Sequence, residues 1–82
     1  MPLAKRWQAL DRGTVAGTPE RWAMYELGND GEIVEIGVGV LRDELKTALT
    51  YSDATQVRWE TCQSQAQAEE LAAEHRERAE LD

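Results

Sequence analysis

Apolar and polar positions alternate along three stretches of this chain of 82 residues, and apolar positions recur at steps of three and four along two others. The alternating stretches are residues 22–27, 32–38 and 56–61, where β-branched and aromatic side chains cluster as they do in strands. The helical spacing covers residues 40–49 and 65–80. We therefore predict an α+β domain with a three-stranded antiparallel sheet and flanking helices.

The first two predicted strands are separated by Gly-Asn-Asp-Gly at positions 28–31, residues that favour a hairpin turn. Side chains alternate between the two faces of a strand, so Tyr25 shares a face with Leu27, and Ile33 shares a face with Glu35. In such a hairpin Tyr25 and Glu35 are expected to point to the same side. The reverse face would carry an apolar ridge, formed by Val34, Ile36 and Val38.

Each predicted helix carries one apolar stripe. Ser64, with Gln67 three residues later, forms a capping box that marks the start of the last helix. His75 lies on the stripe of that helix, and we expect a packed or partly solvated histidine rather than a metal ligand, because no second histidine or cysteine stands at ligand spacing. The residues expected to be buried on the stripes, the ridge and the third strand are Val34, Ile36, Leu41, Leu45, Leu49, Val57, Leu71 and Ala72.

The first 21 residues read as a lead-in that packs on a single globular unit formed by residues 22–82. Leu3, Trp7 and Leu10 recur at helical spacing, which predicts a short helix. Residues 13–20 contain two glycines and a proline, which predict a loop into the first strand. We expect this segment to pack Trp7 over the sheet.

Two triplets on the hairpin resemble the motif of a known nuclease family. Ala23-Met24-Tyr25 and Glu35-Ile36-Gly37 resemble the two halves of the GIY-YIG hairpin. Val40-Leu41-Arg42-Asp43-Glu44-Leu45 follows where that family has a helix of the form Asn-Leu-Arg-x-Arg-Leu, and a third strand and a last helix occupy the family's later positions. The resemblance covers residues 22–79 and implies a GIY-YIG-like fold.

The same resemblance implies that the chemistry of the family is missing. GIY-YIG nucleases use a tyrosine from each hairpin strand, an arginine from the following helix and a metal-binding glutamate from a later helix. Carried over by position, Tyr25 matches the first tyrosine, while Glu35, Glu44 and Ala72 stand where the family has tyrosine, arginine and glutamate. Glu69, three residues before Ala72, is the acid nearest to the same helix face. No catalytic residue and no metal ligand is expected in this vestigial pocket of Tyr25, Glu35, Glu44, Glu69 and Ala72.

Basic neighbours of Glu44 do not replace the lost arginine. Arg42 and Lys46 each stand two positions from Glu44, so on a helix they point well away from its direction. Glu35, Glu44 and Glu69 together form either a carboxylate cluster for a hard cation such as Mg²⁺ or, in the preferred interpretation, solvated surface acids.

Hypotheses of different classes follow from these residues. The preferred one is a noncatalytic GIY-YIG-like module, not an enzyme and without a cofactor, that binds a macromolecular partner, most simply a protein. The alternative is a divergent metal-dependent endonuclease or DNA-repair factor that uses Mg²⁺ with Tyr25 and either Glu69 or Glu35. A small structural subunit of a larger assembly is the third.

The charge of the chain argues against a general nucleic-acid surface. Its net charge is −7 and its isoelectric point is about 4.6, whereas binding to phosphates depends on clustered lysine and arginine. The acidic composition resembles that of cytoplasmic proteins of salt-loving archaea. High salt weakens the charge argument, since the Debye length falls to about 3 Å at 1 M.

The cysteine count and the hydropathy pattern predict a cytoplasmic protein. Cys62 is the single cysteine, so no disulfide forms within the chain, and a small buried hydrophobic role is expected for it. The sequence contains no leader with an apolar core and no apolar run of 18 residues, so neither secretion nor a membrane span is expected.

Overall fold

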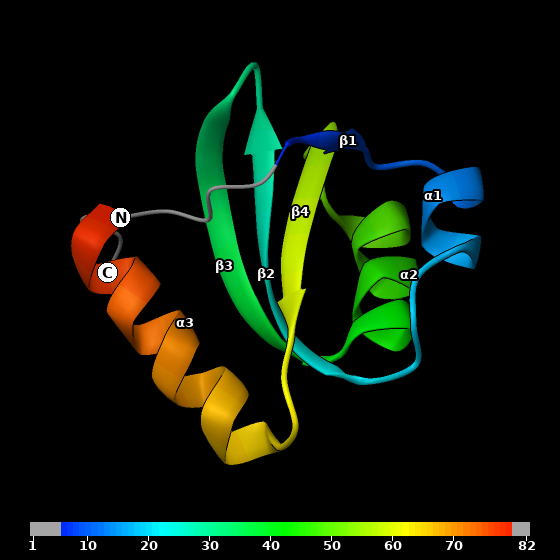
Figure 1. Cartoon of the computed structure of the whole chain (residues 1–82). Coiled ribbons are helices and arrows are strands. Elements are labelled where there is room, and N and C mark those ends of the chain that lie inside the picture. Colours follow the sequence, from blue (N-terminus) through cyan, green and yellow to red (C-terminus); the bar gives the residue numbers. More distant parts are fainter. Residues whose placement is uncertain (1–5, 80–82) are drawn as a thin grey trace.

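A computed structural model describes residues 6–79 of the chain as an antiparallel sheet with helices on both faces (Figure 1). The sheet has four strands in the order β1-β4-β2-β3, and every neighbouring pair is antiparallel. The elements in chain order are β1 (Gln8–Ala9), α1 (Arg12–Ala16), β2 (Trp22–Asn29), β3 (Glu32–Val40), α2 (Leu41–Tyr51), β4 (Gln56–Thr61) and α3 (Gln65–Ala79).

The α+β class is confirmed, but the sheet has one strand more than the pattern predicts. β1 pairs with β4 through Gln8 and Ala9, so the segment predicted as a helix around Trp7 and Leu10 is extended instead. Leu3 lies outside the described residues. The helix of the lead-in, α1, begins later, where Asp11 caps it by accepting a hydrogen bond from the Thr14 N–H at 2.8 Å. The predicted loop over 13–20 is therefore partly helical.

The hairpin is confirmed, with longer strands and a tighter turn than predicted. β2 and β3 continue until Asn29 faces Glu32, which leaves only Asp30 and Gly31 in the turn. Both turn residues have positive φ, 51° and 82°, as a type I′ turn requires. Asp and Gly tolerate this conformation better than most residues. The residues in the turn therefore suit the two-residue loop that the strand register requires.

A bulge in β3 overturns part of the predicted facing. Leu27 pairs with Glu35 while Gly28 pairs with Ile33, so Val34 is an extra residue without a partner on β2. Val34 is 50% exposed rather than buried. The bulge also moves Ile33 to the face opposite Glu35, where it packs with Ile36.

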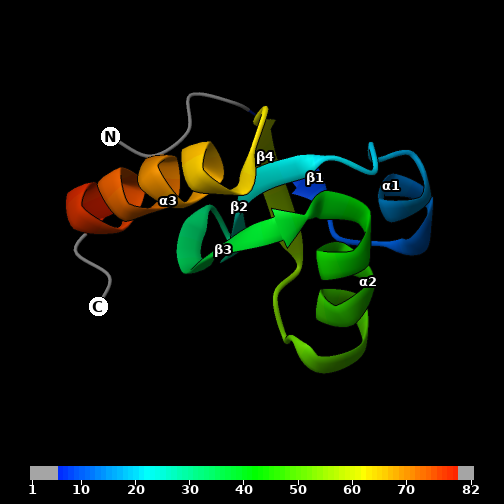
Figure 2. The same cartoon turned by 90° about the horizontal axis from the view of Figure 1, so that it is seen from below.

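The two faces of the sheet are covered by different helices (Figure 2). α2, with α1 beside it, covers the face that carries Tyr25 and Leu27, and α3 covers the face that carries Met24 and Ile36. Because β2 lies inside the sheet and between the helix layers, its residues from 23 to 28 are all buried. Each face therefore has its own apolar cluster.

Most of the predicted core is in place. Ile36, Leu41, Leu45, Val57 and Ala72 are buried. Leu49 and Leu71 are partly buried and pack against the borders of the two clusters. Cys62 is buried, as predicted.

The start of α3 follows the predicted capping box. The Ser64 hydroxyl oxygen accepts from the Gln67 N–H at 3.1 Å. The Gln67 side-chain oxygen accepts in turn from the Gln63 N–H at 2.7 Å. Two backbone donors at the helix start are thereby satisfied, and the direction in which the chain leaves β4 is fixed.

The lead-in packs on the sheet at both ends of its described part. The Trp7 ring lies so close to Gly28 that a Cβ there would collide with it. Val15 of α1 is 2% exposed and belongs to the cluster beneath α2. Within residues 6–79, no helix is long and apolar enough to cross a membrane.

Candidate functional site

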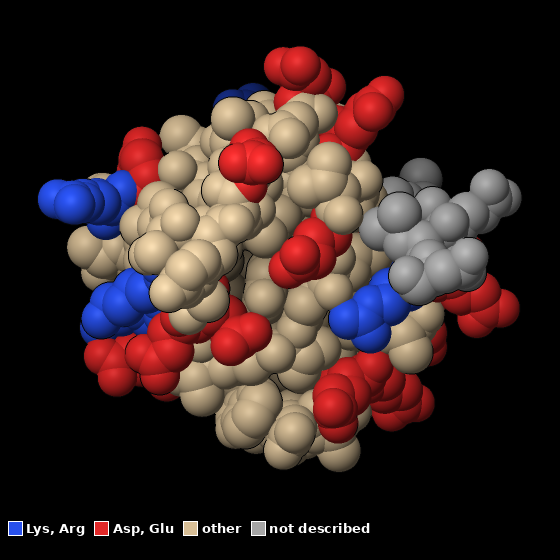
Figure 3. Space-filling view, turned by 180° about the vertical axis from the view of Figure 1, so that it is seen from behind, with Lys and Arg blue, Asp and Glu red and all other residues tan. Residues whose placement is uncertain are grey.

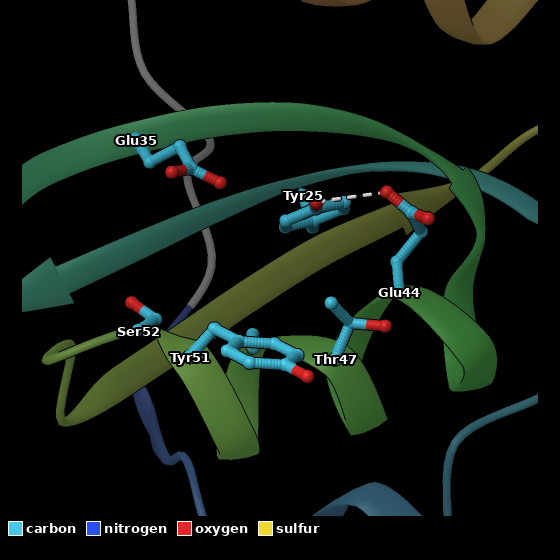
Figure 4. Close-up of a pocket in the computed structure, with 7 residues that line it drawn as sticks. Tyr25, Glu35, Glu44, Thr47, Tyr51 and Ser52 are labelled. Carbon is cyan, nitrogen blue, oxygen red and sulfur yellow. Dashed lines mark hydrogen bonds between the residues drawn. The ribbon is translucent and has the colours of Figure 1, made fainter.

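A pocket of about 300 Å³ opens between the hairpin and α2, on the sheet face that carries Tyr25 (Figure 4). β2 contributes Tyr25 and β3 contributes Glu35 to one side, and α2 with the residue after it forms the other. The side chains that line this hollow, which we call the Tyr25 pocket, are Tyr25, Glu35, Glu44, Thr47, Ala48, Tyr51 and Ser52.

Two glycines of β3 shape the floor of the pocket. Gly37 faces Tyr25 across the strand pair, and a Cβ on Gly37 would collide with the tyrosine ring. Gly39 allows the Glu44 side chain the same close approach. The ring and the Glu44 side chain therefore lie against the backbone of β3, and the Tyr25 hydroxyl donates a hydrogen bond to Glu44 Oε1 at 3.1 Å.

The electrostatics of the pocket keep Tyr25 protonated. Burial raises the pKa of the Tyr25 hydroxyl, and the nearby carboxylates of Glu44 and Glu35 raise it further because each disfavours a second negative charge. Tyr25 is thus a hydrogen-bond donor at physiological pH, and it is not a proton acceptor. None of the described residues that line the pocket is cationic, and Arg76 of α3 offsets the effect of the two carboxylates on Tyr25 only in part.

The structure brings together only part of the vestigial pocket predicted from the sequence. Tyr25 and Glu35 meet as the pleat predicts, and Glu44 joins them as the resemblance implies. Ala72 is fully buried on the other side of the sheet, where α3 packs on Met24 and Ile36.

Glu69 is exposed on α3 and does not line the Tyr25 pocket. The expectation that Glu69 shares the face of this pocket is wrong, because the helix that carries it covers the opposite face of the sheet. Within residues 6–79, no group of three or more His, Cys, Asp or Glu side chains is arranged to hold a metal ion.

The basic neighbours of Glu44 point away from it, as predicted. Arg42 donates from Nε and Nη2 to the carbonyl oxygen of Thr18 at 3.0 and 2.6 Å, and it pairs with Glu20. It therefore ties α2 to the loop after α1. Lys46 lies on the far side of α2, in a different hollow. Neither side chain supplies positive charge to the Tyr25 pocket.

A second polar cluster, not predicted from the sequence, lies beneath α3. Glu26 is fully buried, and its carboxylate accepts from Arg58 Nε at 2.6 Å and faces His75 Nδ1 at 3.3 Å. The Arg58 guanidinium stacks 4.0 Å from the centre of the Trp7 ring. The prediction that His75 is packed is confirmed, and its partner is this acid.

A signal for this cluster was present in the sequence. Glu26 is the only charged residue of β2, in the middle of an otherwise uncharged strand. Arg58 faces it directly on β4, and such opposite charges on neighbouring strands stabilise a sheet. The cluster links the lead-in, two strands and α3 on the face opposite the Tyr25 pocket, and it is a structural element.

The outer surface agrees with the acidic composition. In the view from behind, acidic side chains are spread around the visible face, and basic side chains stand apart from one another (Figure 3). A continuous basic surface of the kind that nucleic acids require is not visible on this face.

Comparison with known proteins gives one match. Residues 1–78 match the model of a family described as a domain of unknown function, DUF7508. No curated protein and no solved structure matches the chain.

Proposed function

The chain belongs to the DUF7508 family, and we propose that it is a noncatalytic module with a GIY-YIG-like fold that binds a protein partner through the Tyr25 pocket. The observation that supports this most is the content of the pocket. Among residues 6–79, its lining combines two tyrosine rings with two carboxylates and includes no cationic side chain. Such a pocket suits a positively charged group, which proteins carry on lysine and arginine.

The same content disfavours phosphodiester cleavage. Hydrolysis of a phosphodiester requires that the negative charge of the phosphate be offset by a cation or by hydrogen-bond donors. Glu35 and Glu44 oppose that charge, and the Tyr25 hydroxyl is already engaged with Glu44. Ala72 lies on the other face of the sheet, so a glutamate at this position would not reach the pocket.

The rings of the pocket favour a cationic side chain over a bare metal ion. Guanidinium and ammonium groups are attracted to aromatic faces and hydrogen-bond to carboxylates at the same time. Tyr51 lines the pocket and is 83% exposed, so its ring is not packed in the core and is free to contact a ligand. An arginine or lysine of a partner protein would cover this ring and pair with Glu44.

The first test is a nuclease assay. We expect the purified protein to leave supercoiled plasmid and single-stranded RNA uncut, at background level, with Mg²⁺ or Mn²⁺ and at both low and high salt. Metal-dependent cleavage that disappears in Tyr25→Phe or Glu69→Gln would contradict the proposal. That result would support the alternative, a divergent metal-dependent endonuclease.

The second test uses a cationic probe, a short peptide with one arginine between glycines, followed by amide chemical shifts. We expect saturable shifts around Tyr25, Glu44 and Tyr51, with weak affinity because the probe is small. The double variant Glu35→Gln, Glu44→Gln should weaken binding by about tenfold, since the amides keep the shape but remove both charges. Glu70→Gln, an exposed acid on α3, is the matched control and should bind as the unmodified protein does. Equal binding by the double variant and the control would refute the role of the pocket.

A further inference from the structure

A second hollow, the α1–α2 groove, is lined by residues of both helices. The two helices lie side by side at one end of the molecule (Figures 1 and 2). Around the helix axis Lys46 stands about 200° from Glu44, so the two hollows use different sides of one helix. The groove has a volume of about 370 Å³ and shares no lining residue with the Tyr25 pocket. Its lining side chains are Arg12, Val15, Ala16, Lys46, Leu49 and Thr50.

The groove is the reverse of the Tyr25 pocket in charge. Two cations, Arg12 and Lys46, line it, and none of its described lining residues is an acid. Both cations are exposed. Within residues 6–79 the ion pairs of arginines involve Arg42, Arg58 and Arg78, and neither Arg12 nor Lys46 takes part in one. In a chain of net charge −7, these two cations beside one groove form a local positive site.

The walls of the groove are fixed by contacts that the fold already makes. Val15 anchors α1 in the core, and Asp11 caps the first turn of the helix. Arg42 of α2 holds the carbonyl oxygen of Thr18, just after α1. A ligand therefore meets a site whose shape is largely set before binding, which lowers the entropic cost of association.

We propose that the α1–α2 groove binds an acidic segment of a partner protein, in which an apolar side chain lies between carboxylates. The apolar part of the lining, Val15, Ala16 and Leu49, gains from contact with an apolar side chain. Arg12 and Lys46 pair with the flanking acids. A nucleic acid offers phosphates but no aliphatic side chain for the apolar lining, and it needs more clustered cations than this groove has.

The test is a titration of the whole chain, followed by amide chemical shifts, with a peptide that alternates pairs of glutamate and leucine. We expect saturable shifts in α1 and at Lys46, Leu49 and Thr50. Two matched peptides serve as controls, one with lysine for glutamate and one with serine for leucine. Both controls should bind at least about tenfold more weakly, because one loses charge complementarity and the other loses the apolar contact.

Variants of the protein test the same groove. The double reversal Arg12→Glu, Lys46→Glu should weaken binding of the acidic peptide by about tenfold or more at low salt. Ala16→Glu should also weaken binding of the acidic peptide, since it adds an acid to the groove at an exposed position. Arg21→Glu, an exposed cation outside the groove, is the control and should leave binding unchanged. Circular dichroism establishes that each variant is folded.

Several results would overturn the proposal. They are an absence of shifts at millimolar peptide, shifts centred on the Tyr25 pocket, equal binding of the lysine peptide, and tighter binding of a thymidine octamer to the same groove. Because the groove and the pocket share no residue, a failure here leaves the cationic-probe test of the Tyr25 pocket unaffected.

Discussion

Glu26→Ala is expected to destabilise the domain by about 3–5 kcal/mol, because it leaves Arg58 largely buried without the carboxylate that balances its charge. Glu26 is fully buried, and it also faces His75 of α3. A domain of 82 residues has a free energy of unfolding of roughly 4–12 kcal/mol, so this loss removes a large part of it, and all of it at the lower end of that range. Urea denaturation at neutral pH measures it.

The controls separate charge from shape. Glu26→Gln keeps a hydrogen-bond acceptor of the same size and should cost less than the alanine variant. Replacing Glu26 and Arg58 together by methionine should also cost less than Glu26→Ala, since no buried charge is then left alone. Glu70 is exposed on α3, the helix that covers Glu26, and Glu70→Ala should change the free energy of unfolding by no more than about 0.5 kcal/mol. A Glu26→Ala variant as stable as Glu70→Ala would show that the cluster does not hold α3 on the sheet.

The long elements of this fold are predictable because they repeat a pattern. β4 was predicted with its observed bounds, and α2 and α3 within two residues, since each carries enough apolar positions to define a period. β1 has two residues, which is too short for any period, and its pairing with β4 depends on a distant part of the chain. Local pattern cannot detect such a strand.

The bulge at Val34 shows a related limit. Alternation assigns a face to every residue only while the register is regular, and one extra residue reverses the assignment beyond it. Ile33 was assigned to the wrong face for this reason, and Val34, the extra residue, is exposed rather than buried. The residues nearer α2, such as Glu35 and Gly37, were unaffected because the register there continues unbroken to Val40.

The candidate site was predictable on one side of the sheet and not on the other. Tyr25 and Glu35 follow from the pleat of the hairpin, and Glu44 was assigned by the resemblance to a helix that comes directly after the hairpin, so all three meet. The periodicity of α3 gives its apolar stripe but does not say which face of the sheet the stripe covers. Ala72 and Glu69 were assigned to the pocket by resemblance alone, and the packing of α3 separates them from it.

Glu26 was missed for a different physical reason. Charged residues are mostly exposed, so an acid in a strand is normally assigned to solvent. β2 is the exception, because helices cover both faces of the sheet and strands flank both of its edges. An acid at its centre has to be buried, and it then needs the arginine that faces it on β4.

Leu45→Ala is expected to cost about 2–5 kcal/mol, the range for deletion of a buried leucine side chain. Leu45 is 0% exposed and belongs to the cluster of Tyr25, Leu41 and Ala48 beneath α2. The lost free energy of unfolding has two parts, the transfer of the leucine side chain out of water and the cavity that it leaves. The layer between α2 and the sheet can collapse into that cavity only in part. Thr50→Ala, an exposed position on the same helix, is the matched control and should change stability by less than about 0.5 kcal/mol.

Because α2 also forms a wall of the Tyr25 pocket, the Leu45 variant should bind the arginine probe more weakly even where it remains folded. An unchanged denaturant midpoint in Leu45→Ala would mean that α2 does not depend on its apolar stripe for its position against the sheet.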